Sequence, residues 1–185
     1  MEFWHIRQRE AELRRLGMYA YLCGSVEYSP DQGRSWRAAI TPFLQGLGHH
    51  VYDPQLDDRK SLTELERRDF RTWKAENLPR FQRVMRKIMD YDLQRLETRC
   101  DYVVAYWDEY ASRGGGTQGE LTLAYRRACP VYLVANMPLE QVSSWILGCA
   151  TEVFTDFEQL KDFLRKKFAS VPKPELSELE PVEAP

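Results

Sequence analysis

The stretch DYVVAYW, residues 101–107, decides the fold class of this chain. Six of its residues in a row are aliphatic or aromatic. An unbroken apolar run of this kind is typical of a strand that is covered on both faces, as in a parallel sheet. Three consecutive glycines, Gly114 to Gly116, follow in a loop, and a helix is expected over residues 117–128. A strand, a loop and a helix in this order predict a parallel α/β unit.

Short apolar segments and helical segments alternate along the rest of the chain. Strands are expected at residues 18–23, 50–53, 101–107, 130–135 and 151–155. Helices are expected between them, one with an apolar face at Ile40, Phe43, Leu44 and Leu47, and others at residues 61–76, 79–99, 117–128, 136–147 and 156–168. This alternation predicts an α/β fold with a doubly wound, five-stranded parallel sheet of the flavodoxin-like or Rossmann-like kind, helices on both faces and a helical insert.

Ligands bind such sheets at the carboxyl ends of the strands, near the switch point. The loops after the first, third and fourth strands are therefore expected to hold the site. Local signals also mark helix ends: Ser61 and Glu64 fit a capping box, and Asn136 with Pro138 fits a first helical turn. The buried stripe of the 79–99 helix is expected to consist of Phe81, Val84, Ile88, Leu93 and Leu96.

Length and charge bound the organisation of the chain. Its 185 residues, 43% of them apolar, predict one domain over residues 18–170, with a helix at 1–17 ahead of it and a charged helical insert at 55–99. Residues 171–185 are rich in Glu and Pro and are expected to be disordered. The net charge of −2 argues against a generally basic nucleic-acid binder. The arginines of the insert are interpreted as a solvated face rather than a binding patch.

Cysteine usage and hydropathy indicate the compartment. Cys23, Cys100, Cys129 and Cys149 form no CxxC pair and no Cys/His cluster, so we expect reduced thiols and no bound metal. The chain has no apolar stretch of the ~18 residues that a membrane span needs. Residues 1–7 lack an apolar signal core. We therefore expect a cytoplasmic protein with no membrane partner and no nucleic-acid polymer as partner.

The glycine loop and Glu120 form the first candidate for chemistry. Glycines ahead of a helix let a ligand approach the backbone closely, and the helix N-terminus offers free N–H groups. With the helix starting near Thr117, Glu120 is expected in the first turn, where the helix dipole favours its ionised form. An ionised carboxylate in a ligand cleft can attack an electrophilic sugar carbon. The competing interpretations are a flexible loop and an ordinary first-turn acid.

A set of ordered motifs resembles the nucleoside 2-deoxyribosyltransferase-like family. The motifs are Tyr21-Leu22-Cys23-Gly24-Ser25, Trp36-Arg37, residues 48–54, Asp92-Leu93 ahead of Asp101-Tyr102-Val103-Val104, Gly116-Thr117-Gln118-Gly119-Glu120-Leu121-Thr122-Leu123-Ala124, and Pro130-Val131. The resemblance spans about residues 18–165. The chain departs from the family in one extra histidine within 48–54, in a long insert, and in Asp92 lying one residue further from its strand than usual, which leaves Asp90 as an alternative.

The resemblance implies a mechanism for an N-glycosidase or a deoxyribosyltransferase. Glu120 would be the nucleophile at C1′, Tyr21 would orient it, and Asp92 would contact and protonate the leaving base. Asp108 would be a second base-contacting acid, although it lies further from Glu120 than the family's acid does. Tyr21 as ordinary core, and Asp92 as a helix cap or an ion-pair partner, are the competing interpretations.

The same resemblance implies the substrate-binding residues: Gly24, Ser25, Trp36, Arg37, Gly116, Thr117 and Asn136. Arginine suits a phosphate, but Trp36 and Arg37 are equally interpretable as anchors of their helix. The family often pairs subunits, so a homodimer or a larger homo-oligomer is expected, with Trp145 as a candidate interface residue.

The expected function is cleavage or transfer at the N-glycosidic bond of a nucleoside or a nucleoside 5′-monophosphate, without a cofactor. Two alternatives stay open. One is a non-catalytic nucleotide-binding or interaction module on the same fold. The other is a glycohydrolase acting on a dinucleotide such as NAD.

Overall fold

The structure is a computed structural model that describes residues 17–57 and 62–168. The helix expected over residues 1–17 and the tail expected over residues 171–185 lie outside the described residues, Gly17 apart. No helix in the described part is long and apolar enough to cross a membrane.

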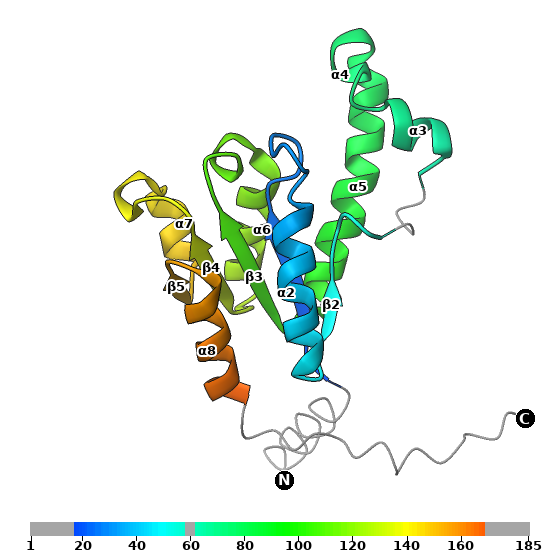
Figure 1. Ribbon diagram of the computed structural model, residues 1–185. Helices are drawn as coiled ribbons and strands as arrows, with labels where there is room; N and C mark the ends of the chain where they lie inside the picture. The colour runs from blue at the N-terminus through cyan, green and yellow to red at the C-terminus, as the bar shows by residue number, and fades with distance from the viewer. Residues whose placement is uncertain (1–16, 58–61, 169–185) are drawn as a thin grey trace, which may run out of the picture.

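Five parallel strands form one sheet within the described residues, in the order β2-β1-β3-β4-β5 (Figure 1). They are β1 (Tyr19–Gly24), β2 (His50–Tyr52), β3 (Tyr102–Trp107), β4 (Val131–Ala135) and β5 (Glu152–Phe154). The expected doubly wound sheet is confirmed, and each strand lies within one residue of its expected bounds. Since the chain crosses over β1 on its way from β2 to β3, the switch point lies between β1 and β3.

Helices cover both faces of the sheet (Figure 1). On one face, α2 (Arg34–Gly46) and α8 (Phe157–Phe168) pack on the strands. On the other lie α6 (Gly115–Arg126), α7 (Ser144–Cys149) and the C-terminal part of α5 (Leu78–Arg99). Two 3-10 helices, η1 (Ala111–Arg113) and η2 (Leu139–Gln141), complete the loops after β3 and β4.

The apolar run of β3 contributes side chains to the cores on both faces of the sheet. Val103 and Ala105 point into one core and Tyr102 and Val104 into the other, and each is at most 1% exposed. Side chains alternate between the faces of a strand, so a strand buried on both sides must be apolar throughout. This explains why the DYVVAYW stretch predicts the fold class.

The insert differs from its expected form. A single helix over 61–76 is wrong, since the structure has α3 (Glu64–Asp69) and a separate short α4 (Trp73–Glu76). Of the expected box of Ser61 and Glu64, Ser61 lies outside the described residues. Thr63 caps α3, accepting from the Glu66 backbone, while the Glu66 side chain accepts from the Thr63 backbone.

Two further helix expectations need correction. A helix over 136–147 is wrong, because η2 and α7 occupy this segment and Gly148 lies within α7. The buried stripe of α5 contains Val84 and Leu96 as expected, but Asp92 is buried in place of Leu93. A helical stripe predicted from apolar residues alone misses a polar group that is buried for another reason.

The insert has a small core of its own. Phe70, Trp73 and Val84 are buried together there, separately from the two cores of the sheet. Because α5 runs from this core down to the sheet, α3, α4 and the first half of α5 stand out from the body of the molecule (Figure 1). The insert therefore supplies a wall next to the switch point.

All four cysteines are free thiols, as expected. Cys23 and Cys149 are buried, whereas Cys100 and Cys129 are partly exposed and their sulfur atoms lie 3.4 Å apart.

Truncating Leu121 tests the packing of α6 on the sheet. Leu121 is fully buried, so Leu121→Ala leaves a cavity and should lower the free energy of unfolding by about 2–5 kcal/mol. Leu65→Ala on α3 is the control, because Leu65 is 43% exposed and its loss should change stability by no more than about 0.5 kcal/mol. Urea unfolding measures both, and equal losses would contradict the assigned core.

Candidate active site

A cleft of about 680 Å³ opens at the carboxyl edge of the sheet, at the switch point. The loop after β1 and the start of α6 form one side of it, and α3 and α5 of the insert form the other. Its volume falls in the range of roughly 300–1,000 Å³ that is usual for small-molecule sites. The loops after the first and third strands line this cleft as expected, whereas the loop after the fourth strand, also expected there, does not.

Glu120 lies at the inner end of the cleft with both carboxylate oxygens held. The Tyr21 hydroxyl donates to Oε1 at 2.7 Å, and the Cys23 thiol donates to Oε2 at 2.9 Å. Both donors come from β1, two residues apart, so their side chains point to the same face of the sheet. The carboxylate is therefore fixed in orientation from behind, with the cleft in front of it.

The electrostatics of Glu120 differ from the expectation. The helix begins at Gly115, so Glu120 lies in its second turn and not in the first. Burial raises its pKa above the usual value, and the bonds from Cys23 and Tyr21 oppose this rise. Stabilisation of the ionised form therefore comes from two side-chain donors and not from the helix end. Burial also raises the pKa values of Tyr21 and Cys23, so both keep their protons and remain donors.

Asp92 lies on α5 and lines the same cleft, whereas Asp90 is exposed and does not. Asp92 is 7% exposed, and the Tyr52 hydroxyl donates to its Oδ1 at 2.7 Å. The rings of Tyr52 and Tyr21 pack 5.1 Å apart, centroid to centroid. Negative charge on Asp92 also raises the pKa of Glu120. Two neighbouring tyrosines thus hold two carboxyl groups close enough to influence each other.

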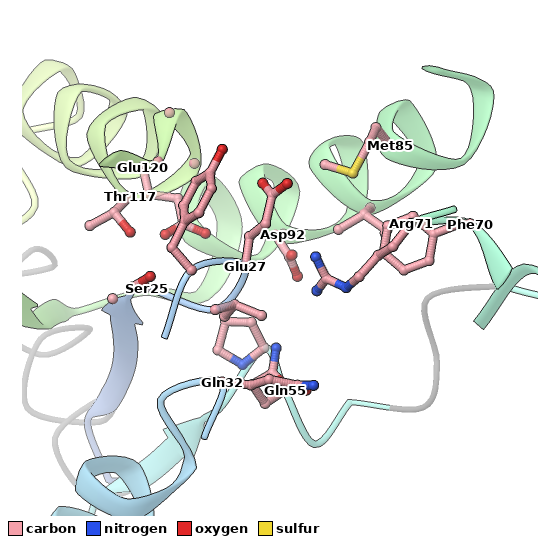
Figure 2. Close-up of a pocket in the computed structure, with 18 of the residues that line it drawn as sticks. Ser25, Glu27, Gln32, Gln55, Phe70, Arg71, Met85, Asp92, Thr117 and Glu120 are labelled. Carbon is pink, nitrogen blue, oxygen red and sulfur yellow. The ribbon is translucent and has the colours of Figure 1, made fainter. Parts of the chain in front are cut away.

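The loops place four of the expected substrate-binding residues at the cleft. Gly24 and Ser25 line it after β1, and Gly116 and Thr117 line it at the start of α6 (Figure 2). A Cβ atom on Gly24 would lie 2.9 Å from the Trp36 ring. Glycine is therefore required there by the packing of Trp36 beneath the loop.

Trp36 and Arg37 act as anchors of α2. Trp36 is buried against Tyr106 and Phe157, outside the cleft lining. Arg37 reaches the cleft wall, but its guanidinium is buried and donates to the carbonyl oxygens of Gly24 and Gly33, each at 3.0 Å. These bonds hold the loop after β1 closed, which favours the anchoring interpretation over phosphate contact.

Asp108 and Asn136 also lie away from the cleft lining. Asp108 accepts from the backbone N–H groups of Tyr110 and Ala111, so its side chain is engaged in the turn that leads into η1. Asn136 is exposed after β4. The exposed Trp145 on α7, whose indole donates to Thr122 at 2.9 Å, also lies outside the cleft lining. Among the described residues, no group of three or more His, Cys, Asp or Glu could hold a metal ion.

Sequence reasoning missed two residues of this arrangement. The place of Cys23 can be predicted from the sequence, because Tyr21 is a candidate and residues two apart on a strand share a face. Tyr52 was not, since its place beside Tyr21 depends on the register of β2 against β1. Arg67, Arg68 and Arg71 of the insert also line the cleft, contrary to their interpretation as a purely solvated face.

Comparison with known proteins finds similarity in structure only. No family model and no curated protein matches the chain. A solved structure of the 2-deoxyribosyltransferase from the psychrotolerant bacterium Bacillus psychrosaccharolyticus does match, with a TM-score of 0.57. This chain shares the fold of a deoxyribosyltransferase. The two sequences are 22% identical, and the match covers 85% of this chain and 99% of the other. At this identity the likeness shows the fold alone.

Replacing Glu120 by Gln should make the protein more stable near neutral pH. A carboxyl group whose pKa is raised by folding contributes stability when protonated and loses it as the pH rises through that pKa. The neutral amide avoids this loss. We expect the midpoint of thermal unfolding at pH 7 to rise by about 2–4 °C, the shift that ~1 kcal/mol gives in a chain of this size. The exposed Glu140→Gln is the control, and a lower midpoint for Glu120→Gln alone would contradict the burial of this charge.

Proposed function

We propose that this protein is an enzyme that cleaves or transfers the N-glycosidic bond of a nucleoside or a nucleoside 5′-monophosphate, with Glu120 as nucleophile. The observation that carries the proposal is the Glu120 carboxylate, held by Tyr21 and Cys23 and facing a cleft that Asp92 also lines. The shared fold with a deoxyribosyltransferase agrees with a nucleoside substrate. The resemblance in sequence motifs implies the same substrate class.

The first step of the proposed reaction forms a glycosyl ester. A Glu120 oxygen attacks C1′, the bond from C1′ to the base nitrogen breaks, and its electron pair leaves with the base. Asp92 gives the base a proton, so a neutral base departs. Fixed hydrogen bonds on Glu120 keep it in position for attack without reorganisation, which is the usual benefit of a preorganised nucleophile.

The second step releases the sugar. Water or an acceptor base attacks C1′ of the ester, the bond from C1′ to Glu120 breaks, and the attacking group loses its proton to Asp92. Both carboxyl groups then return to their starting forms. Water as attacker makes the enzyme a hydrolase, and a base makes it a transferase. The residues at the cleft are compatible with either.

Base release by the wild-type protein tests the proposal directly. Ribonucleosides, deoxyribonucleosides, their 5′-monophosphates and NAD are incubated with the enzyme, with and without an acceptor base, and free base is measured by liquid chromatography. Glu120→Gln should lower the rate at least about a thousandfold, because it removes the nucleophile from a covalent mechanism. Glu140→Gln should retain the wild-type rate. Nucleotide binding without turnover of any substrate would instead indicate a non-catalytic module.

The pH profile tests the role of Tyr21. Attack needs ionised Glu120, so kcat/KM should fall on the acid side as the pH drops through its raised pKa. The bond from Tyr21 lowers this pKa, so Tyr21→Phe should move the acid limb to higher pH. Tyr125→Phe on the exposed side of α6 should leave the limb in place. A limb that is unchanged or moved to lower pH in Tyr21→Phe would contradict the positioning role.

A further inference from the structure

One face of α5 forms a continuous wall of the cleft beyond Asp92. Phe81, Met85, Ile88 and Asp92 all line the cleft, and their spacing of four, three and four residues places them on the same side of a helix. At 1.5 Å per residue, Phe81 lies about 16 Å along the helix from Asp92. A nucleoside held at Asp92 and Glu120 is too short to cover this wall.

The wall continues on the leaving-group side of the bond that breaks. Glu120 is tied to Tyr21 in the sheet, Asp92 comes next, and α5 then runs away from the sheet into the insert (Figure 1). Figure 2 shows the same order, with Glu120 and Thr117 at one end, Asp92 in the middle, and Phe70 and Met85 at the other. Whatever occupies the outer end is therefore attached to the base and not to the sugar.

The wall of the cleft at its outer end, beyond Asp92, is apolar. Val84 and Trp73 are 1% and 6% exposed and make the small core of the insert. Phe81, Met85 and Ile88 pack against that core but stay partly exposed, and they line the cleft. Their exposed surface is thus not needed to close the core. The Phe81 ring stacks on Phe70, with centroids 6.3 Å apart and planes 7° apart, which gives this end a flat aromatic floor.

A cation accompanies this apolar wall. The Arg71 guanidinium is directed into the cleft (Figure 2) and lies 5.0 Å from the centre of the Phe70 ring. Arg68 is bound through two nitrogens to Asp69, at 2.6 and 2.7 Å. Arg71 has no such carboxylate partner within residues 17–57 and 62–168. A planar guanidinium next to an aromatic floor matches a carboxylate or phosphate at the end of an apolar group.

We propose that the outer end of the cleft is a specificity subsite for a substituted nucleobase. The inference rests on the proposed function. The leaving base carries an apolar substituent that ends in a negative charge. Phe81, Met85 and Ile88 contact the apolar part, and Arg71 binds the anionic end. Ionised Glu120 would repel an anion, so its end of the cleft disfavours the reverse orientation.

The insert is held over this subsite by a contact across the cleft. Lys74 on α4 pairs at 2.8 Å with Glu27, which lies in the loop after β1 and lines the cleft. This ion pair keeps the part of the insert that carries Arg71 facing the loop after β1. It is exposed, so it is weak enough to open for a substrate with a long substituent.

Binding of free bases tests the subsite without any turnover. Three probes are titrated calorimetrically in an adenine series and in a cytosine series: the unsubstituted base, its N-benzyl derivative and its N-(4-carboxybenzyl) derivative. The wild-type protein should bind the carboxybenzyl base at least about tenfold more tightly than the benzyl base, since a hydrogen bond to a charged group gives about this factor or more. The benzyl base should in turn bind more tightly than the unsubstituted one.

Variants separate the two contacts. Arg71→Gln should abolish the preference for carboxybenzyl over benzyl, whereas Arg83→Gln, exposed on α5 outside the cleft lining, should retain it. Met85→Ala should reduce the preference for benzyl over unsubstituted base, and Met89→Ala, 50% exposed outside the lining, should not. Thermal unfolding confirms that each variant is folded.

The outcomes distinguish this inference from the proposed function. Equal affinity for all three probes, or a carboxybenzyl preference that survives Arg71→Gln, overturns the subsite. Release of base from the corresponding nucleosides with no such affinity pattern leaves the proposed function standing and overturns the subsite alone. The affinity pattern without base release from any nucleoside supports the subsite and overturns the proposed function.

Discussion

Burial of β3 on both faces is the constraint on which the rest of the structure depends. Its neighbours β1 and β4 pair with its backbone through hydrogen bonds, and its side chains require an apolar layer on each face of the sheet. The chain must therefore send α2 to one face after β1 and α6 to the other after β3. That divergence leaves a cleft between the two loops, and Glu120 and the loop after β1 meet there. The location of the cleft follows from how the core is covered.

At the candidate site, burial of Glu120 opposes its negative charge, and hydrogen bonds to the carboxylate favour that charge. Placing Glu120 beside Asp92 and behind a wall of aromatic side chains disfavours its ionised form, and the hydroxyl of Tyr21 and the thiol of Cys23 offset part of this effect. Replacing water by two fixed donors leaves a carboxylate that is less well stabilised than in solution, which agrees with the role proposed for it. Such a group is costly for folding, which is common where a side chain is arranged for chemistry.

The sequence predicted the sheet well because strands buried on both faces leave continuous apolar runs. It also brought Tyr21, Asp92 and Glu120 into one hypothesis, and they lie together in the structure. It did not predict Tyr52, because strand register has no local signal. Arg71 was assigned to a solvated face, since helical periodicity separates buried from exposed positions but does not tell bulk water from a cleft. The role expected for Asp108 stays a prediction, and its side chain accepts hydrogen bonds from the backbone of the turn that follows β3.

The continuity of α5 has a mechanical consequence. Its C-terminal half packs on the sheet beside α6, and its N-terminal half belongs to the small core of the insert. Bending of α5 near Asp92 would move Met85 and Phe81 more than it would move Asp92 relative to Glu120, because only the C-terminal half of the helix is held by the sheet. The two ends of the cleft therefore depend on different cores. On the roles proposed above, changes to the insert would alter what the outer end recognises while Glu120 and Asp92 keep their positions.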